Sequence, residues 1–135
     1  MAWKKQMDEM MDQPGITHHG RVGQKELREY HKKVGIFAYP THFSETFCIG
    51  AVEAQLAGVV PVTMNLAALQ ETVGCGVKVV GDIYDPKVRQ TYLQALLTYM
   101  KDEKLWKTES EKGKKFAEEY AWSKIAKKWV KEMSI

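Results

Sequence analysis

The hydrophobic and polar positions of this chain change period repeatedly along its first two thirds. Short apolar runs rich in β-branched and aromatic side chains predict strands, at 16–19, 36–39, 59–63 and 77–80. Apolar residues spaced three and four positions apart predict helices between them, over 2–12, 24–33, 46–56 and 66–73. Strands that alternate with helices are typical of a parallel sheet covered on both faces.

The last third of the chain predicts helices only. Asp85 followed by Pro86 is a strong helix start, because aspartate caps the free amides and proline fits the first turn. Further helices are expected over 103–119 and from Ser123 onward, with the Ser123 hydroxyl as the cap. The sequence therefore predicts one Rossmann-like α/β domain over residues 1–135, with three layers, about four parallel strands and a helical C-terminus.

Composition narrows the class of protein. The 135 residues are 44% hydrophobic, enough for one domain with a core that needs no disulfides. Twenty basic residues oppose 17 acidic ones, and the excess lies in residues 101–135, where ten lysines face seven acids. This surplus is too small and too mixed to indicate nucleic-acid binding.

The cysteines and histidines do not predict a metal site. Cys48 and Cys75 are far apart in sequence, and the four histidines lack the spacing of metal ligands. Two free thiols favour a reduced, cytoplasmic protein, and no apolar stretch is long enough to cross a membrane. The lysine-rich C-terminal helices leave a peripheral contact with an anionic membrane as an alternative, although interspersed glutamates favour a solvated face.

Two glutamates with seven residues between them are the main candidates for chemistry. Glu45 is expected just after a parallel strand, at the edge where open α/β sheets bind ligands. The amides of Thr46, Phe47 and Cys48 are expected to open the next helix and to form a phosphate site. Glu53 is expected further along that helix.

The spacing of the two glutamates argues against a glycoside hydrolase. Eight helical steps rise about 12 Å, whereas the carboxylate pair of a hydrolase lies within roughly 5–9.5 Å. Separate tasks at the two ends of one elongated ligand fit the spacing better. A nucleotide-sugar, with sugar, diphosphate and ribose in line, is such a ligand.

The residues around these glutamates resemble a known family. The segment 39–55, YPTHFSETFCIGAVEAQ, is similar to the corresponding motif of retaining GT-B glycosyltransferases of family 4. Three further segments resemble that family in the same order, at 19–30, 67–73 and 116–129. The resemblance covers about residues 3–133. It implies the donor-binding half of an enzyme that transfers a hexosyl unit from a nucleotide-sugar with retention of configuration, with no metal and no cofactor besides the donor.

The resemblance also implies roles for single residues. Glu45 corresponds to the catalytic carboxylate that contacts the transferred sugar, and Glu53 to the carboxylate that binds the nucleotide ribose. Both roles suit a carboxylate, which can accept two hydrogen bonds from a vicinal diol. The other donor-binding positions are expected at the base, beside Glu45 and along the diphosphate, namely Arg21, Val22, His42, Thr46, Phe47, Cys48 and Ile49.

The sequence departs from the family pattern at several points. Cys48 stands where the family usually has glycine, and Ala67 and Ala68 replace a glycine pair. The family's first glycine-containing strand and loop, its Arg and Lys for the diphosphate, and its acceptor domain have no match. We therefore expect a domain truncated on its N-terminal side, inactive alone, with the acceptor half supplied in trans or upstream. A non-catalytic nucleotide-sugar or interaction module and an unrelated α/β ligand-binding domain remain alternatives.

Overall fold

The computed structural model describes residues 2–134 and contains a parallel sheet between layers of helices. The sheet has three strands in the order β1-β2-β3, namely β1 (Ile36–Tyr39), β2 (Val60–Met64) and β3 (Val77–Val79). Ile36 is in register with Val60, and Val62 is in register with Val77. The mixed α/β class, the parallel sheet and the helical C-terminus predicted from the sequence are confirmed.

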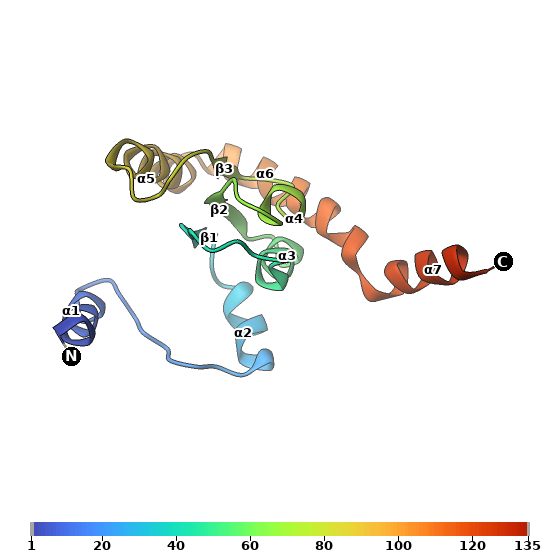
Figure 1. Ribbon diagram of the computed structural model, residues 1–135, viewed down its shortest axis with the longest axis horizontal. Helices are drawn as coiled ribbons and strands as arrows, with labels where there is room; N and C mark the ends of the chain where they lie inside the picture. Colours follow the sequence, from blue (N-terminus) through green and yellow to red (C-terminus); the bar gives the residue numbers. More distant parts are fainter. Residues whose placement is uncertain (1, 135) are drawn as a thin grey trace.

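Helices cover both faces of this sheet (Figure 1). The helices are α1 (Ala2–Met11), α2 (Gln24–His31), α3 (Ile49–Leu56), α4 (Leu69–Thr72), α5 (Pro86–Lys101), α6 (Glu103–Ala117), the 3₁₀ helix η1 (Glu118–Tyr120) and α7 (Trp122–Met133). Helix α5 lies on one face, and α3 and α4 lie on the other (Figure 1). Helix α6 packs against α3, whereas α7 extends away from the body of the domain.

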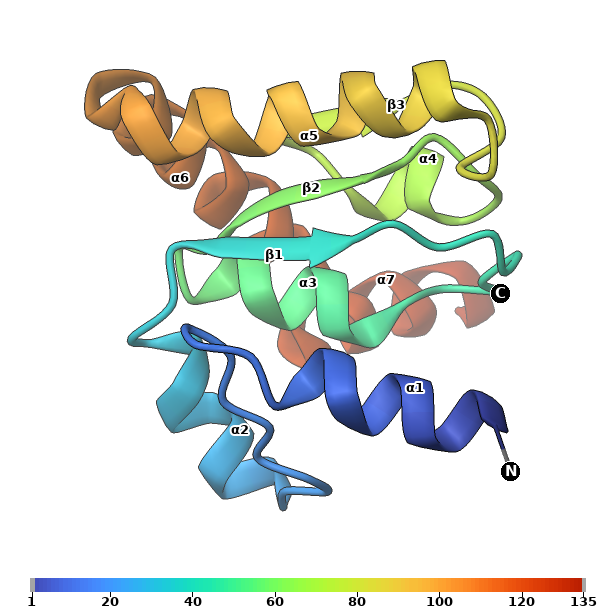
Figure 2. The ribbon, with the colours of Figure 1, turned by 90° about the vertical axis from the view of Figure 1, so that its left-hand side faces the viewer.

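The prediction of a strand at 16–19 is wrong. These residues are exposed and irregular, and they run between α1 and α2, away from the sheet (Figure 2). The His19 ring lies against α2, where its Nδ1 is 3.0 Å from the hydroxyl oxygen of Tyr30. A strand needs a neighbour for its backbone groups, and none of the three strands reaches this segment.

Two predicted helix starts are also wrong, for a shared reason. Helix α3 begins at Ile49 and not at residue 46, because Cys48 adopts a left-handed conformation with φ 63°. Helix α4 begins at Leu69 and not at residue 66, because Ala67 has φ 46°. A left-handed residue cannot continue a right-handed helix.

The prediction that Ser123 caps the last helix is wrong as well. Helix α7 begins at Trp122, so Ser123 already lies inside the helix, and no side chain caps its first turn. The start of α5 is confirmed, since an Asp85 side-chain oxygen accepts a 2.8 Å hydrogen bond from the Lys87 amide.

The core lies on both sides of β2, whose five residues are all buried. On the α5 face, Val60, Val62 and Met64 pack with Tyr92 and Tyr99. On the α3 face, a second cluster contains Ala51, Leu69 and Val73. The two clusters fix the carboxyl ends of the strands between the helices that cover them.

A buried glutamine connects α3 to the chain after α4. The Gln55 side chain is fully buried, and its Nε2 donates to the carbonyls of Ala51 and Thr72 at 2.9 and 2.8 Å. Its Oε1 accepts a 2.9 Å hydrogen bond from the Gly74 amide. The bonds to Thr72 and Gly74 satisfy backbone groups at and after the end of α4 that the helix leaves free, so α3 and α4 are held in one arrangement.

Candidate functional site

Glu45 lies in the loop that follows β1, at the carboxyl edge of the sheet. Its side chain is half-buried, and Oε1 accepts a 2.6 Å hydrogen bond from the Tyr39 hydroxyl. Its backbone carbonyl accepts a 3.2 Å hydrogen bond from the Ala68 amide, in the loop after β2. Glu45 is therefore held between the two loops that leave the adjacent strands β1 and β2.

The hydrogen bond to Glu45 perturbs its phenolic partner. It raises the pKa of Tyr39 above the ordinary value, and burial of the ring adds to the effect. The hydroxyl of Tyr39 therefore remains protonated and donating over the physiological range. One carboxylate oxygen of Glu45 is fixed in this way, and Oε2 has no intramolecular partner within residues 2–134.

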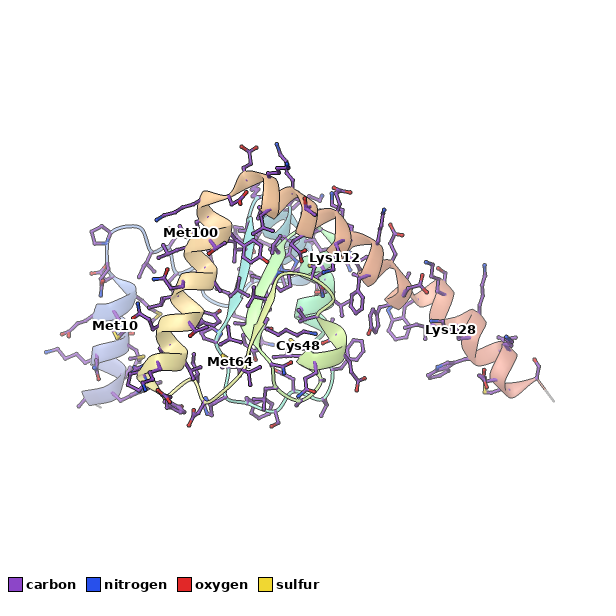
Figure 3. All side chains as sticks on the ribbon, turned by 90° about the horizontal axis from the view of Figure 1, so that it is seen from above. Met10, Cys48, Met64, Met100, Lys112 and Lys128 are labelled. Atoms are coloured by element: carbon purple, nitrogen blue, oxygen red, sulfur yellow. The ribbon has the colours of Figure 1, made fainter. Side chains whose placement is uncertain are left out.

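Both loops beside Glu45 contain a left-handed residue that is not glycine. Cys48 ends the β1–α3 loop with φ 63°, and Ala67 lies in the β2–α4 loop with φ 46°. Among residues 2–134, these two alone combine a side chain with a positive φ. Figure 3 shows Cys48 at the same end of the sheet as Met64, the last residue of β2.

The thiol of Cys48 is half-buried beside this site. Burial raises the pKa of the Cys48 thiol, and the charge of Glu45 raises it further. The thiol is therefore neutral near pH 7 and behaves as a small apolar group rather than a nucleophile.

The start of α3 presents amides that differ from the expected set. Cys48 is the N-cap residue, so the first helical amides belong to Ile49 and Gly50. The next amide, of Ala51, already donates to the Cys48 carbonyl at 3.1 Å. Thr46 belongs to the preceding loop, and the Phe47 ring turns away to meet Tyr120 edge-on at 5.5 Å. The expectation that Thr46, Phe47 and Cys48 open the helix is therefore wrong.

His42 lies in the same loop as Glu45 but faces α5. Its Nδ1 is 3.2 Å from the hydroxyl oxygen of Tyr84. The His42 ring also lines a pocket of about 470 Å³ between the end of β1 and α5. The structure records no bond between His42 and Glu45.

Glu53 occupies a separate place. It lies on α3 and lines a pocket of about 380 Å³ together with Arg28 and His31 of α2 and Lys32, the residue that caps the C-terminus of α2. Arg21 and Val22 precede α2 and do not line this pocket. Glu45 and Glu53 thus lie on one loop–helix unit, Glu45 beside Tyr39 and Glu53 in the pocket near α2.

The sequence did not identify three of the residues that surround the glutamates. The sequence predicts Tyr39 only as the end of a strand, although its place six residues before Glu45 allows its side chain to reach the loop. Arg28 and Lys32 fall within the helix that the sequence predicts over 24–33. No sequence signal places them beside Glu53, because that contact depends on how α2 packs near α3.

Residues 2–134 contain neither a metal-binding cluster nor a membrane-spanning helix. No group of three His, Cys, Asp or Glu side chains is arranged to hold a metal ion. No described helix is long and apolar enough to span a membrane.

The parallel sheet between helical layers defines a Rossmann-like α/β domain, with the Glu45 carboxylate at its strand ends. The family model described as glycosyl transferases group 1 matches residues 2–116. Because this match covers most of the chain, the protein belongs to the group 1 glycosyltransferases. A comparison with curated proteins found no match.

Proposed function

We propose that this chain is the donor-binding domain of a retaining GT-B glycosyltransferase of the family-4 type. It binds a nucleotide-sugar, and the hexosyl unit passes to an acceptor held by a second domain. Glu45 contacts the hydroxyls of the transferred sugar, and Glu53 binds the ribose. The family membership gives glycosyl transfer in general, and the proposal adds the donor, the stereochemistry and the residue roles.

One observation carries this proposal. The two loops around Glu45 bend at Cys48 and Ala67 through left-handed conformations that glycine adopts without strain. These are positions where the family resembled by the sequence usually has glycine. A backbone that retains this bend despite a side chain supports a conserved shape of the donor site, since each left-handed residue destabilises the fold by about 1–2 kcal/mol.

The diphosphate is proposed to bind at the start of α3. The amides of Ile49 and Gly50 are free of intrahelical partners at this end. Backbone amides and the helix dipole both favour an anion there. Arg21, Val22 and His42 are proposed to contact the outer parts of the donor, at the base and at the sugar.

The acceptor half is proposed to lie in another polypeptide or another segment of the parent protein. Helix α7 extends from the domain (Figure 1), and it exposes large apolar side chains at helical spacing. These side chains are Trp122, Trp129, Val130 and Met133. The proposed location is the cytoplasm, which is supported by the two free thiols.

Calorimetric titration of the chain with paired ligands tests the residue roles. The ligands are UDP, GDP and ADP, and the corresponding hexose conjugates. Glu53→Ala is expected to weaken binding of both members of a pair by about 1.5–3 kcal/mol, the range for a hydrogen bond to a charged group. Glu45→Ala is expected to weaken the sugar conjugate only.

The matched control is Glu103→Ala. Glu103 is an exposed carboxylate on α6 that pairs with Lys107 at 2.6 Å, remote in sequence from the proposed site. Glu103→Ala is expected to leave the affinities for the nucleoside diphosphates and for their hexose conjugates unchanged. Equal losses for both ligands in Glu45→Ala would contradict its assignment to the sugar, and unchanged affinities in Glu53→Ala would contradict its assignment to the ribose.

A further inference from the structure

The loop that carries Glu45 has few backbone bonds of its own. It connects β1 to α3, and no amide of residues 42–48 donates to a backbone carbonyl within residues 2–134. The Glu45 carbonyl accepts the 3.2 Å hydrogen bond from the Ala68 amide, which ties the loop to its neighbour at one point. A segment with so few backbone bonds depends on side-chain contacts to keep its shape.

Phe47 connects this loop to the end of α6. Phe47 lies two residues after Glu45, and its ring meets the ring of Tyr120 edge-on, with centroids 5.5 Å apart and planes at 71°. An edge-to-face pair of this kind stabilises beyond the burial of its surface, because the positive edge of one ring faces the negative face of the other. The Phe47 side chain is still 39% exposed, so the hydrophobic core does not enclose it.

Tyr120 is itself held from two further sides. It ends η1, directly after α6, and its ring lies 5.6 Å from the ring of Phe116. Its hydroxyl donates a 3.3 Å hydrogen bond to the Glu71 carbonyl of α4. Phe116 in turn lies against the backbone of Gly74, where any side chain would overlap its ring. Tyr120 therefore contacts the loop before α3 and also α4, the helix that follows the second loop beside Glu45.

We propose that Tyr120 is a positioning residue for the donor site, because its ring holds Phe47 and thereby keeps the Glu45 carboxylate in place for the transferred sugar. This inference rests on the role proposed above for Glu45. Tyr120 acts through Phe47 and not by touching the donor. It lies beyond residues 2–116, so the family match does not include it.

A ligand-free measurement separates positioning from simple packing. A packing role alone would change the free energy of unfolding and leave Glu45 in place in the folded protein. The Tyr39 hydroxyl donates its 2.6 Å hydrogen bond to Glu45, so the Tyr39 phenol reports where this carboxylate lies. That bond is the largest cause of the raised Tyr39 pKa, and displacement of the carboxylate would lower the pKa.

The titration of Tyr39 is followed in the full chain by NMR of tyrosine labelled at Cζ, with Tyr39→Phe to assign the signal. Tyr120→Leu is expected to lower the Tyr39 pKa, in the same direction as removal of the charge in Glu45→Gln. Tyr120→Phe keeps the ring and is expected to keep the parent value. Trp122→Leu is the matched control, because Trp122 is an aromatic residue two positions further on that is 81% exposed.

Phe47→Leu tests the same contact from its exposed side, and it decides the matter alone if Tyr120→Leu does not fold. It is expected to lower the Tyr39 pKa as Tyr120→Leu does. The double variant is expected to shift the pKa no further, because both substitutions remove one interaction. An unchanged Tyr39 pKa in Phe47→Leu would overturn the proposal. A shift of equal size in Trp122→Leu would also overturn it, because any change near the start of α7 would then have the same effect.

Calorimetry with the paired ligands extends the test to the donor. Tyr120→Leu is expected to weaken binding of the hexose conjugate by about three- to tenfold, the size of the coupling in an aromatic pair. The affinity for the nucleoside diphosphate is expected to stay unchanged. Equal changes for the two ligands would overturn the positioning role. If the parent chain binds no hexose conjugate, the proposed function fails, whereas the Tyr39 titration still decides whether Tyr120 holds Glu45 in place.

Discussion

The hydroxyl of Tyr39 donates a 2.6 Å hydrogen bond to Oε1 of Glu45, from the last residue of a strand to the loop that follows it. This bond limits the rotation of the carboxylate that is proposed to contact the sugar. Tyr39→Phe removes the bond and keeps the ring in its apolar cluster. We expect it to weaken binding of the nucleotide-sugar by about 1 kcal/mol and to leave the nucleoside diphosphate unaffected, as measured by calorimetry.

The hydrogen bond between Tyr39 and Glu45 can also be tested by spectroscopy, without a ligand. Because Glu45 raises the pKa of Tyr39, the neutral variant Glu45→Gln is expected to shift the titration of this phenol to lower pH. Titration followed by ultraviolet absorbance, with Tyr39→Phe to assign the step, measures it. An unchanged Tyr39 titration in Glu45→Gln would contradict a dominant role for the Glu45 carboxylate.

Ala67 offers a direct test of backbone strain. Its φ of 46° disfavours any residue with a Cβ, whereas glycine adopts it freely. Ala67→Gly is therefore expected to raise the free energy of unfolding by about 0.5–1 kcal/mol, after allowance for the greater flexibility of glycine in the unfolded chain. The matched control is Ala57→Gly, because Ala57 has an ordinary φ of −80°. This variant is expected to lower the free energy of unfolding by about 0.5–1 kcal/mol. Urea unfolding measures both, and a loss in Ala67→Gly equal to that control would contradict the strain.

The sequence predicted the strands and helices around the core because their apolar periods are strong. It placed β1 and the start of α5 correctly, where Pro40 ends the strand and Asp85 with Pro86 begins the helix. It failed at residues 16–19, whose apolar character is that of a strand but which have no neighbouring strand to pair with. Pairing is a tertiary property, and a local pattern cannot supply it.

The sequence likewise predicts some features of the candidate site and misses others. The position of Glu45 at the carboxyl edge could be predicted, because it depends on the order of strand, loop and helix. The starts of α3 and α4 could not be predicted, since neither Cys48 nor Ala67 is a residue type that indicates a left-handed bend. The surroundings of Glu53 could not be predicted either, because the neighbours Arg28 and Lys32 come from α2 and its C-terminal cap.

Gln55 is expected to be one of the most sensitive positions of the core. Gln55→Leu fills a similar volume but leaves the Thr72 carbonyl and the Gly74 amide without the partners that the side chain provides. Unpaired buried groups destabilise a fold by about 1–3 kcal/mol each, so we expect a loss of about 2–5 kcal/mol in urea unfolding. A loss below that of an exposed substitution such as Gln94→Leu would show that water replaces these bonds.

Alkaline pH is expected to destabilise the domain through groups that the fold keeps neutral. Burial raises the pKa of the Cys75 thiol from 9.0 to about 12, and the charge of Glu109 adds to this effect. Burial likewise raises the pKa of Tyr92 to about 12. Because the folded values are the higher ones, this stability is fully present below pH 9 and is lost as pH rises from 9 toward 12.

Urea unfolding at a series of pH values checks this dependence. Cys75→Ala removes the first group to titrate, so its free energy of unfolding is expected to fall less steeply than that of the parent between pH 9 and about 10. The variant is less stable at neutral pH, and only the slope carries the prediction. Identical slopes would show that the Cys75 thiol ionises in the folded state as easily as in the unfolded one.

The chain alone is expected to lack transferase activity although its carboxyl-edge site is formed. Transfer requires a positioned acceptor, neutralisation of the leaving diphosphate and exclusion of water. The amides of Ile49 and Gly50 supply part of the second requirement, but no Arg and Lys match the pair expected for the diphosphate. Loss of such positioned donors lowers rates by about a hundredfold or more each.

We therefore expect neither transfer nor donor hydrolysis above background when the purified chain is incubated with radiolabelled nucleotide-sugars and simple glycoside or lipid acceptors. Calorimetry on the same preparation is expected to show donor binding that depends on Glu53. Binding without turnover would agree with a donor domain that needs an acceptor half to close the cleft. Transfer to an added acceptor that depends on Glu45 would instead show that this chain rebuilds the acceptor side by itself.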